Sequence, residues 1–211
     1  MKQSNTIIIL NGDTVSKSIF RKFCKRGDYI ICADGGANSA RKLGVKPDII
    51  IGDLDSISRT NLSYFKKLGV EVRKISEQET TDFEKSLMYA VEFGLDNIIV
   101  FGATGSRTDH VLNIYSVMKR YCKVLNLRII DNEFEIFYLK EKIEKKYGKN
   151  KLISLLGMPA AKGVTTKGLK YGLNGESLEF GVREGTLNFS SANKIMIEKK
   201  AGDLLVFLKH S

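Results

Sequence analysis

The fold is decided by residues 29–55, which read YIICADGGANSARKLGVKPDIIIGDLD. Two short runs rich in β-branched residues, 29–33 and 49–51, flank a helical pattern over residues 37–43. The first run ends at a turn of Asp34 and two glycines, and the second ends at an acidic loop that holds Asp53 and Asp55. A strand–helix–strand order of this kind predicts parallel strands joined by a crossover helix.

The same alternation continues on both sides of this stretch. Further strands are expected at residues 7–10, 70–75, 98–101 and 124–130, and further helices at 16–24, 62–68, 82–93 and 108–121. Uninterrupted apolar runs such as residues 97–101, NIIVF, are typical of strands buried on both faces. Residues 1–131 are therefore predicted to form an α/β domain with a mostly parallel sheet flanked by helices.

The pattern changes after Asp131. Residues 133–139 alternate polar and apolar side chains, as a half-buried strand does, and shorter strands are expected at 151–155, 163–166, 177–180, 193–198 and 204–208. The pair Asn174-Gly175 predicts a hairpin turn, and the lysine-rich residues 140–151 predict an exposed connection. Residues 132–211 are thus expected to form a small antiparallel β-sandwich.

Composition excludes several classes of protein. The 211 residues are 43% hydrophobic and carry a net charge of +10, spread evenly over the two parts, so the chain is neither disordered nor tailed by a basic arm. No aromatic platform interleaves with basic residues, and no apolar run approaches a membrane span or a secretory signal. Three scattered cysteines without a C-x-x-C pair fit a reducing cytoplasm.

Aspartates follow successive strands of the first part. Asp34 follows one strand, Asp53 and Asp55 the next, Asp82 the next, and Asp109 lies beyond the fifth. The carboxyl ends of parallel strands share one edge of a sheet, so these side chains are expected to gather there. Two like charges at ~4 Å repel by roughly 1–4 kcal/mol at effective dielectric constants of about 80 to 20. Carboxylates without His or Cys therefore favour a Mg²⁺ site, although a single aspartate could simply cap a helix.

Glycine and arginine accompany these acids. Gly35, Gly36, Gly102 and Gly105 would let backbone N–H groups approach an anion, although turn formation alone also explains them. Neither standard phosphate-binding loop is present. Arg107 is a candidate phosphate clamp because a guanidinium matches the geometry of a phosphate, or else an ordinary surface residue.

Six segments together resemble the thiamine pyrophosphokinase (thiamine diphosphokinase) family. They are DGGAN at 34–38, PDIIIGDLDSI at 47–57, TDFEKSL at 81–87, GATGSRTDHVLNI at 102–114, TTKGLKYGL at 165–173 and AGDLLVF at 201–207. The resemblance implies a nucleotide- and Mg²⁺-binding catalytic domain over 1–131 and a thiamine-binding, dimerising β-sandwich over 132–211. It implies a cytoplasmic homodimer, with sites between subunits, that converts ATP and thiamine into AMP and thiamine diphosphate.

The resemblance also implies roles for single residues. The catalytic set would be Asp53, Asp55, Asp82, Arg107, Asp109 and Gln78, with Asp53, Asp55 and Asp82 binding Mg²⁺. The nucleotide would contact Asp34, Gly35, Gly36, Gly102, Thr104, Gly105 and Arg107, and thiamine would contact Asp109, Tyr171 and Asn188. Asp82 and Asp109 are the candidate acceptors of the hydroxyl proton. The chain departs from the family pattern at Ser106, Tyr171 and Leu187.

Two other functions fit parts of the sequence. One is a metal-dependent nucleotide hydrolase built on the same sheet edge, which would release AMP or phosphate from ATP without an acceptor. The other is a non-catalytic module that binds nucleic acid through its basic surface, with steeply salt-dependent affinity. Neither nucleic acid nor a membrane is the expected partner.

Overall fold

The computed structural model describes residues 5–105 and 107–210. The chain divides into two compact units, Met1–Asn132 and Glu133–Ser211. Ser106, one of the departures noted above, lies outside the described residues.

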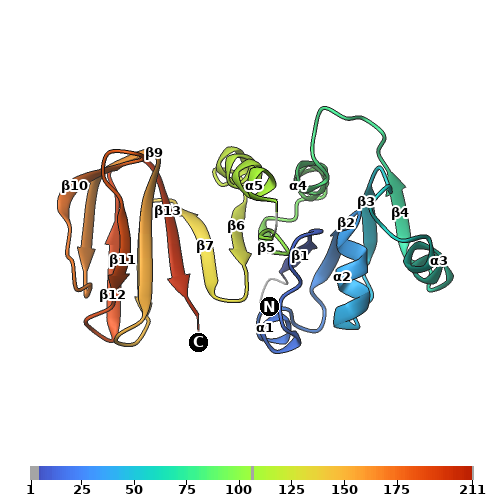
Figure 1. Cartoon of the computed structure of the whole chain (residues 1–211), viewed down its shortest axis with the longest axis horizontal. Helices are drawn as coiled ribbons and strands as arrows, with labels where there is room; N and C mark the ends of the chain where they lie inside the picture. The colour runs from blue at the N-terminus through green and yellow to red at the C-terminus, as the bar shows by residue number, and fades with distance from the viewer. Residues whose placement is uncertain (1–4, 106, 211) are drawn as a thin grey trace. The chain divides into compact units, whose positions relative to one another are not determined.

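The first unit contains a six-stranded parallel sheet (Figure 1). Its strands are β1 (Thr6–Ile9), β2 (Tyr29–Ala33), β3 (Ile49–Gly52), β4 (Glu71–Lys74), β5 (Asn97–Phe101) and β6 (Asn126–Ile130), in the order β4-β3-β2-β1-β5-β6. The chain builds outward from β1 to β4 and then returns to the other side of β1. Ligands of such sheets bind where the order reverses, outside the carboxyl ends of the strands.

Five helices connect these strands, which confirms the predicted α/β class. They are α1 (Lys17–Phe23), α2 (Gly36–Leu43), α3 (Arg59–Lys67), α4 (Asp82–Glu92) and α5 (Thr108–Tyr121). The side chains of Ser16, Ser58 and Thr81 cap α1, α3 and α4 by accepting a backbone N–H of the first turn. The cap at Thr81 fixes Asp82 as the first residue of α4. None of the helices in the described part of the chain is long and apolar enough to cross a membrane.

The sheet is a rigid scaffold for the loops at its edge. Ile8, Ile31, Ile50 and Ile99, from four different strands, are at most 1% exposed. Burying such a side chain contributes roughly 1.5–3 kcal/mol. Burial at consecutive positions means that both faces of the sheet are covered, as the uninterrupted apolar runs predict.

The second unit is antiparallel, as predicted. Its strands are β7 (Phe134–Leu139), β8 (Lys142–Lys146), β9 (Leu152–Lys167), β10 (Asn174–Glu179), β11 (Gly185–Phe189), β12 (Lys194–Glu198) and β13 (Ala201–Lys209). The 16-residue strand β9 pairs with β10, β11, β12 and β13. Its inward residues, including Ile153, Leu155 and Val164, form the core of this unit with residues of the other strands.

Two expectations about this unit, the exposed connection and the hairpin turn, are wrong. Residues 140–151 are not simply an exposed connection, because β8 lies there and pairs with β12. The strands expected at 151–155 and 163–166 are parts of the single strand β9. The charged residues Lys142, Glu144 and Lys146 of β8 face solvent while Ile143 packs against the core, so the sequence of this strand resembles that of a charged linker.

The pair Asn174-Gly175 does not form the hairpin turn. Asn174 begins β10 opposite Thr165, and the chain reverses over residues 168–173. Gly175 has a φ of +72° where the register between β10 and β9 shifts. Glycine is therefore needed for an irregularity within the strand and not for a turn. Strand β11 was not expected from the sequence at all.

Candidate active site

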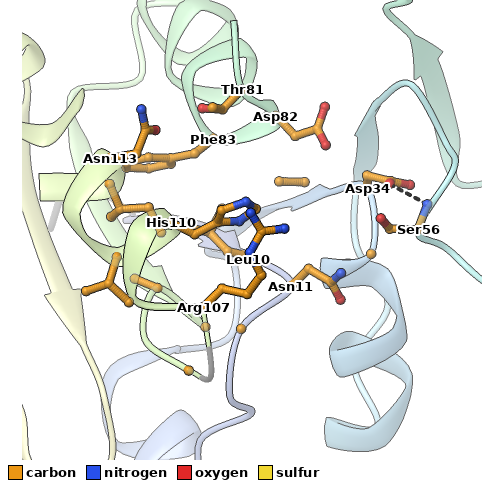
Figure 2. Close-up of a pocket in the computed structure, with 18 of the residues that line it drawn as sticks. Leu10, Asn11, Asp34, Ser56, Thr81, Asp82, Phe83, Arg107, His110 and Asn113 are labelled. Atoms are coloured by element: carbon orange, nitrogen blue, oxygen red, sulfur yellow. Dashed lines mark hydrogen bonds between the residues drawn. The ribbon is translucent and has the colours of Figure 1, made fainter. Parts of the chain in front are cut away.

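A cleft of about 870 Å³ opens at the carboxyl edge of the parallel sheet (Figure 2). The loops after β1, β2, β3, β4 and β5 surround it, together with the first turns of α4 and α5. This is the point at which the strand order reverses, between β1 and β5. The cleft therefore lies where an open parallel sheet binds its ligand.

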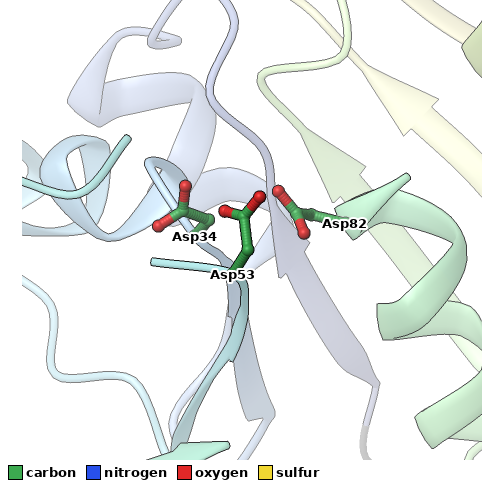
Figure 3. Close-up of side chains that lie close together, drawn as sticks. All are labelled: Asp34, Asp53 and Asp82. Atoms are coloured by element: carbon green, nitrogen blue, oxygen red, sulfur yellow. The ribbon is translucent and has the colours of Figure 1, made fainter. Parts of the chain in front are cut away.

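Three carboxylates converge at this cleft (Figure 3). Asp34 follows β2, Asp53 follows β3, and Asp82 begins α4, and one oxygen of each lies within 4.8 Å of the others. A Cβ atom at Gly52 would lie 3.0 Å from Asp82 Oδ1, so glycine leaves room for this cluster. An all-oxygen ligand set of this kind fits Mg²⁺.

Asp34 is buried and also fixes the neighbouring loop. Its Oδ2 accepts the N–H of Ser56 at 2.8 Å (Figure 2). Its Oδ1 accepts the N–H of Ile57 at 3.2 Å. Burial raises the pKa of Asp34 above its ordinary value, against these hydrogen bonds. The sequence predicted Asp34 as a nucleotide contact, and the structure also places its carboxylate in the acidic cluster.

Asp53 lies at the centre of the cluster in Figure 3. Its oxygens accept the N–H of Asp55 at 3.2 Å and the side-chain amide of Gln78 at 3.4 Å. Desolvation is the largest single effect and raises the pKa of Asp53, but these hydrogen bonds and the charge of Lys85 together hold it below its ordinary value. The structure thus places Gln78 beside Asp53, and its role near the transferred phosphates stays a prediction.

Asp55 is placed differently. Among the described residues, it belongs neither to the group of converging oxygens nor to the lining of the cleft. Its Oδ1 accepts the hydroxyl of Ser56 at 2.8 Å. Leu54, between the two acids, has a φ of +70°, so the chain turns sharply there. That Asp55 binds metal stays a prediction.

Lys85 was missed in the sequence analysis. It is only 4% exposed, and its Nζ lies 3.5 Å from Asp82 Oδ1 and 3.9 Å from Glu77 Oε1. Burial raises the pKa of Asp82, and the nearby Lys85 partly opposes this shift. The i, i+3 spacing of Asp82 and Lys85 on a helix could have indicated the contact.

Two glycine loops form the floor of the cleft by pairing backbone to backbone. Gly12 N–H donates to the Gly102 carbonyl at 2.9 Å, and Asp13 N–H donates to the Thr104 carbonyl at 2.7 Å. A Cβ atom at Gly12 would lie 2.2 Å from the Thr104 carbonyl oxygen. The loop of Asn11, Gly12 and Asp13 was also missed, although it follows the first strand as the predicted acidic loops follow theirs.

The predicted glycines take two kinds of position. Gly35, Gly102 and Gly105 line the cleft, as does Thr104. Gly36 packs against the end of β1, where a Cβ atom would lie 1.9 Å from the Ile9 carbonyl oxygen. Close approach of backbone to backbone therefore explains Gly36, and it also explains Gly102, where a Cβ atom would lie 2.4 Å from the Leu10 carbonyl oxygen.

Arg107 and Asp109 both line the cleft and bind each other. The guanidinium donates to Asp109 through Nε at 3.1 Å and Nη2 at 2.6 Å. These hydrogen bonds lower the pKa of Asp109 to about 2. Both side chains are about two-thirds exposed, so the pair adds little to stability and can exchange partners.

Tyr171 and Asn188 come together in the second unit. Asn188 is 4% exposed, accepts the Tyr171 N–H at 3.0 Å and donates to the Tyr171 carbonyl at 2.6 Å. Tyr171 itself is 59% exposed. Asn188 therefore fixes the backbone at Tyr171, while the preceding Leu187, with a φ of +55°, is exposed.

The fold and the site define a class: an α/β enzyme whose acidic, glycine-lined cleft suits a phosphate ligand with a divalent ion. Residues 20–130 match the family model described as thiamin pyrophosphokinase, catalytic domain. Residues 140–202 match the model described as thiamin pyrophosphokinase, vitamin B1 binding domain. The chain belongs to the thiamine pyrophosphokinase family.

Individual relatives agree with this assignment. The chain is 31% identical to thiamine pyrophosphokinase 1 of Arabidopsis thaliana over 207 residues, which is 83% of this chain and 75% of the relative. It is 29% identical to thiamine pyrophosphokinase of Bacillus subtilis, over 79% of this chain and 85% of the relative.

Solved structures share the fold. The crystal structure of the Bacillus subtilis enzyme superposes with a TM-score of 0.86 at 23% identity, covering 98% of this chain and 100% of the other. The yeast enzyme gives a TM-score of 0.86 at 20% identity, covering 99% and 87%.

Proposed function

We propose that the chain carries out its thiamine pyrophosphokinase reaction in the cleft of the first unit, moving the pyrophosphoryl group of ATP to the hydroxyl of thiamine. The observation that carries the proposal is the convergence of Asp34, Asp53 and Asp82 at the reversal point of the sheet. Glycine loops that present backbone groups to the same space support it.

Asp34, Asp53 and Asp82 would hold Mg²⁺, with Asp55 as a further ligand. Two residues of extended chain span at most about 7 Å, so Asp55 stays within reach of an ion bound by Asp53. When bound, Mg²⁺ neutralises negative charge on the phosphates. Lys85 lies beside Asp82 and supplies a second positive charge to the same space.

The residues of the chain position the reacting groups. The thiamine hydroxyl oxygen bonds to the β-phosphorus, the bond from that phosphorus to the α,β-bridging oxygen breaks, and AMP leaves. Arg107 would bind the phosphates, which requires it to leave Asp109. A carboxylate with a pKa of about 2 accepts protons poorly, so Asp109 could take the hydroxyl proton only after that exchange. Asp82 is the other candidate acceptor.

Acid pH should weaken metal binding. Burial raises the pKa of Asp34 and of Asp82, so in the metal-free enzyme both bind protons at a higher pH than an ordinary aspartate. Protonation of Asp34 and Asp82 stabilises the metal-free folded state. This contribution to the free energy of unfolding is lost as the pH rises through their raised pKa values. Because protons and metal compete, the Mg²⁺ concentration for half-maximal activity should rise as the pH falls toward these pKa values. Activity titrations with Mg²⁺ between pH 5 and 8 would check this, and a constant half-saturation would contradict it.

We also propose a cytoplasmic homodimer, with the second unit contributing to thiamine binding through Tyr171. Exposed apolar residues on β11 and beside β10 support an interface: Phe180 (60% exposed), Val182 (74%), Leu187 (69%) and Phe189 (39%). Asn188, whose amide binds the Tyr171 backbone, would also position Tyr171. Cys24, Cys32 and Cys122 form no disulfide, in keeping with a reducing compartment.

The direct test of the activity is product analysis. Purified protein incubated with Mg²⁺, ATP and thiamine should yield AMP and thiamine diphosphate in equal amounts. AMP formation should cease when thiamine is omitted. AMP or phosphate released from ATP without thiamine would instead indicate the nucleotide hydrolase considered above.

Shared sites between subunits predict complementation. Asp53→Ala and Tyr171→Ala should each lose activity as homodimers. After subunit exchange, about a quarter of the sites would combine an intact acidic cleft with an intact Tyr171, so activity should return to about that fraction. Sites formed within a single subunit would show no recovery.

A further inference from the structure

The loop that carries Asp53 and Asp55 has no regular secondary structure, yet it must present Asp53 accurately to the cluster. After Gly52 the chain runs through residues 53–58 without helix or strand until α3 begins at Arg59. Leu54 has a left-handed backbone, and both Asp55 and Ser56 are exposed. Contacts from outside the loop must therefore fix its position. Ile57, which is 5% exposed, anchors one end in the core.

Asn38, in the first turns of α2, brackets this loop with its side-chain amide. Its Nδ2 donates to the Ser56 carbonyl at 3.0 Å, and its Oδ1 accepts the Ser58 N–H at 3.1 Å. One amide thus binds the carbonyl of one residue and the N–H of the second residue after it, as an adjacent strand would. Oδ1 also accepts the side-chain amide of Asn61 at 2.8 Å.

Asn38 does not reach the ligand space. It is not among the described residues that line the cleft, whereas Asp34, Asp53 and Ser56 are. Asp34 holds the same loop through the N–H groups of Ser56 and Ile57. Two residues of the segment DGGAN, four positions apart, therefore bind consecutive backbone groups of the loop that follows the neighbouring strand.

We propose that Asn38 is a positioning residue for the metal site: its amide holds the loop of residues 53–58 so that Asp53 meets Asp34 and Asp82. The inference rests on the proposed function, since it assumes that these carboxylates bind a divalent ion. Asn38 acts through backbone atoms of Ser56 and Ser58 and touches neither ion nor substrate. Loss of the two hydrogen bonds from Asn38 to Ser56 and Ser58 should therefore weaken metal binding directly.

The test measures metal binding without turnover. Mn²⁺ binding to the full chain, in the presence of α,β-methylene ATP, is followed by the EPR signal of free Mn²⁺. Asn38→Ala should weaken Mn²⁺ binding about 10-fold, the usual loss when a residue that orients metal ligands is removed. Asn61→Ala, the matched control, removes one hydrogen bond but leaves the bracket intact, so its loss should stay below about 2-fold.

Asn38→Asp keeps the acceptor for Ser58 but removes the donor to Ser56, so it should fall between the wild type and Asn38→Ala. It also serves as the test if Asn38→Ala does not fold. Wild-type Mn²⁺ affinity in a folded Asn38→Ala or Asn38→Asp, or equal losses in Asn38→Ala and Asn61→Ala, would overturn the inference. Asp53→Ala distinguishes a wrong role for Asn38 from a wrong metal site, because unchanged Mn²⁺ binding in that variant would overturn the proposed metal site itself.

Discussion

Replacing Asp53 by alanine is expected to lower turnover at least ~100-fold while the protein stays folded, a loss typical of removing charge stabilisation at a reacting group. Asp53 lies between Asp34 and Asp82, so its removal deprives the cluster of its central ligand (Figure 3). The fold should survive because Asp53 is only partly buried and holds no distant element in place. Steady-state kinetics at saturating Mg²⁺, with circular dichroism of the same sample, give the measurement.

A matched control tests whether the loss is specific to the acidic cluster or follows from removing any carboxylate. Glu71→Ala removes an exposed carboxylate from β4 of the same unit and should leave turnover near the wild-type value. Asp55→Ala is expected to lose at least ~100-fold as well if Asp55 joins the ion in the working enzyme. Near-normal turnover in both Asp53→Ala and Asp55→Ala would remove the assigned metal ligands.

The second large effect is expected at Lys85. Lys85→Met keeps the buried stem but removes the ammonium 3.5 Å from Asp82 Oδ1. The loss of a fixed charge aimed at the phosphates should reduce kcat/KM for MgATP about 100- to 1,000-fold. Breaking the ion pair should also destabilise the metal-free fold by about 1–3 kcal/mol, less than for a fully buried pair because the Asp82 side chain is 31% exposed.

Kinetics and urea unfolding of Lys85→Met would check both effects. Lys74→Met, on the exposed face of β4, is the control for loss of a positive charge and should change neither quantity appreciably. If Lys85→Met retained near-normal kcat/KM for MgATP, Lys85 would be a purely structural residue.

Much of the first unit could be predicted because its signals are local. Apolar strands, capped helices and the acidic residue after each strand follow from short stretches of sequence and from the rule that parallel strands end at one edge. The convergence of Asp53 and Asp82 follows from the same rule. Asp34 was expected at this edge by the same rule, but it was assigned to the nucleotide and not to the metal, and its φ of +39° and its hydrogen bond across to Ser56 show how it reaches the cluster.

Other features depend on tertiary contacts that no local pattern contains. In the sequence, Lys85 is one lysine within a helical pattern and nothing marks it as buried. Its burial follows from the packing of α4 over the sheet. Strand β8 has lysines on its outward face, so its sequence resembles that of an exposed linker. Only its pairing with β12 identifies it as a strand. Asn188 was predicted to contact thiamine, and no local pattern indicates that its amide also binds the backbone of Tyr171, 17 residues earlier in the chain.

The most direct test of the metal site is anomalous X-ray diffraction from crystals grown with Mn²⁺ and α,β-methylene ATP. We expect a peak between Asp34, Asp53 and Asp82, about 2–2.3 Å from at least two of their oxygens, as for hard divalent ions on carboxylates. A peak elsewhere in the cleft, or none at saturating Mn²⁺ and nucleotide, would contradict the convergence of these acids on one ion.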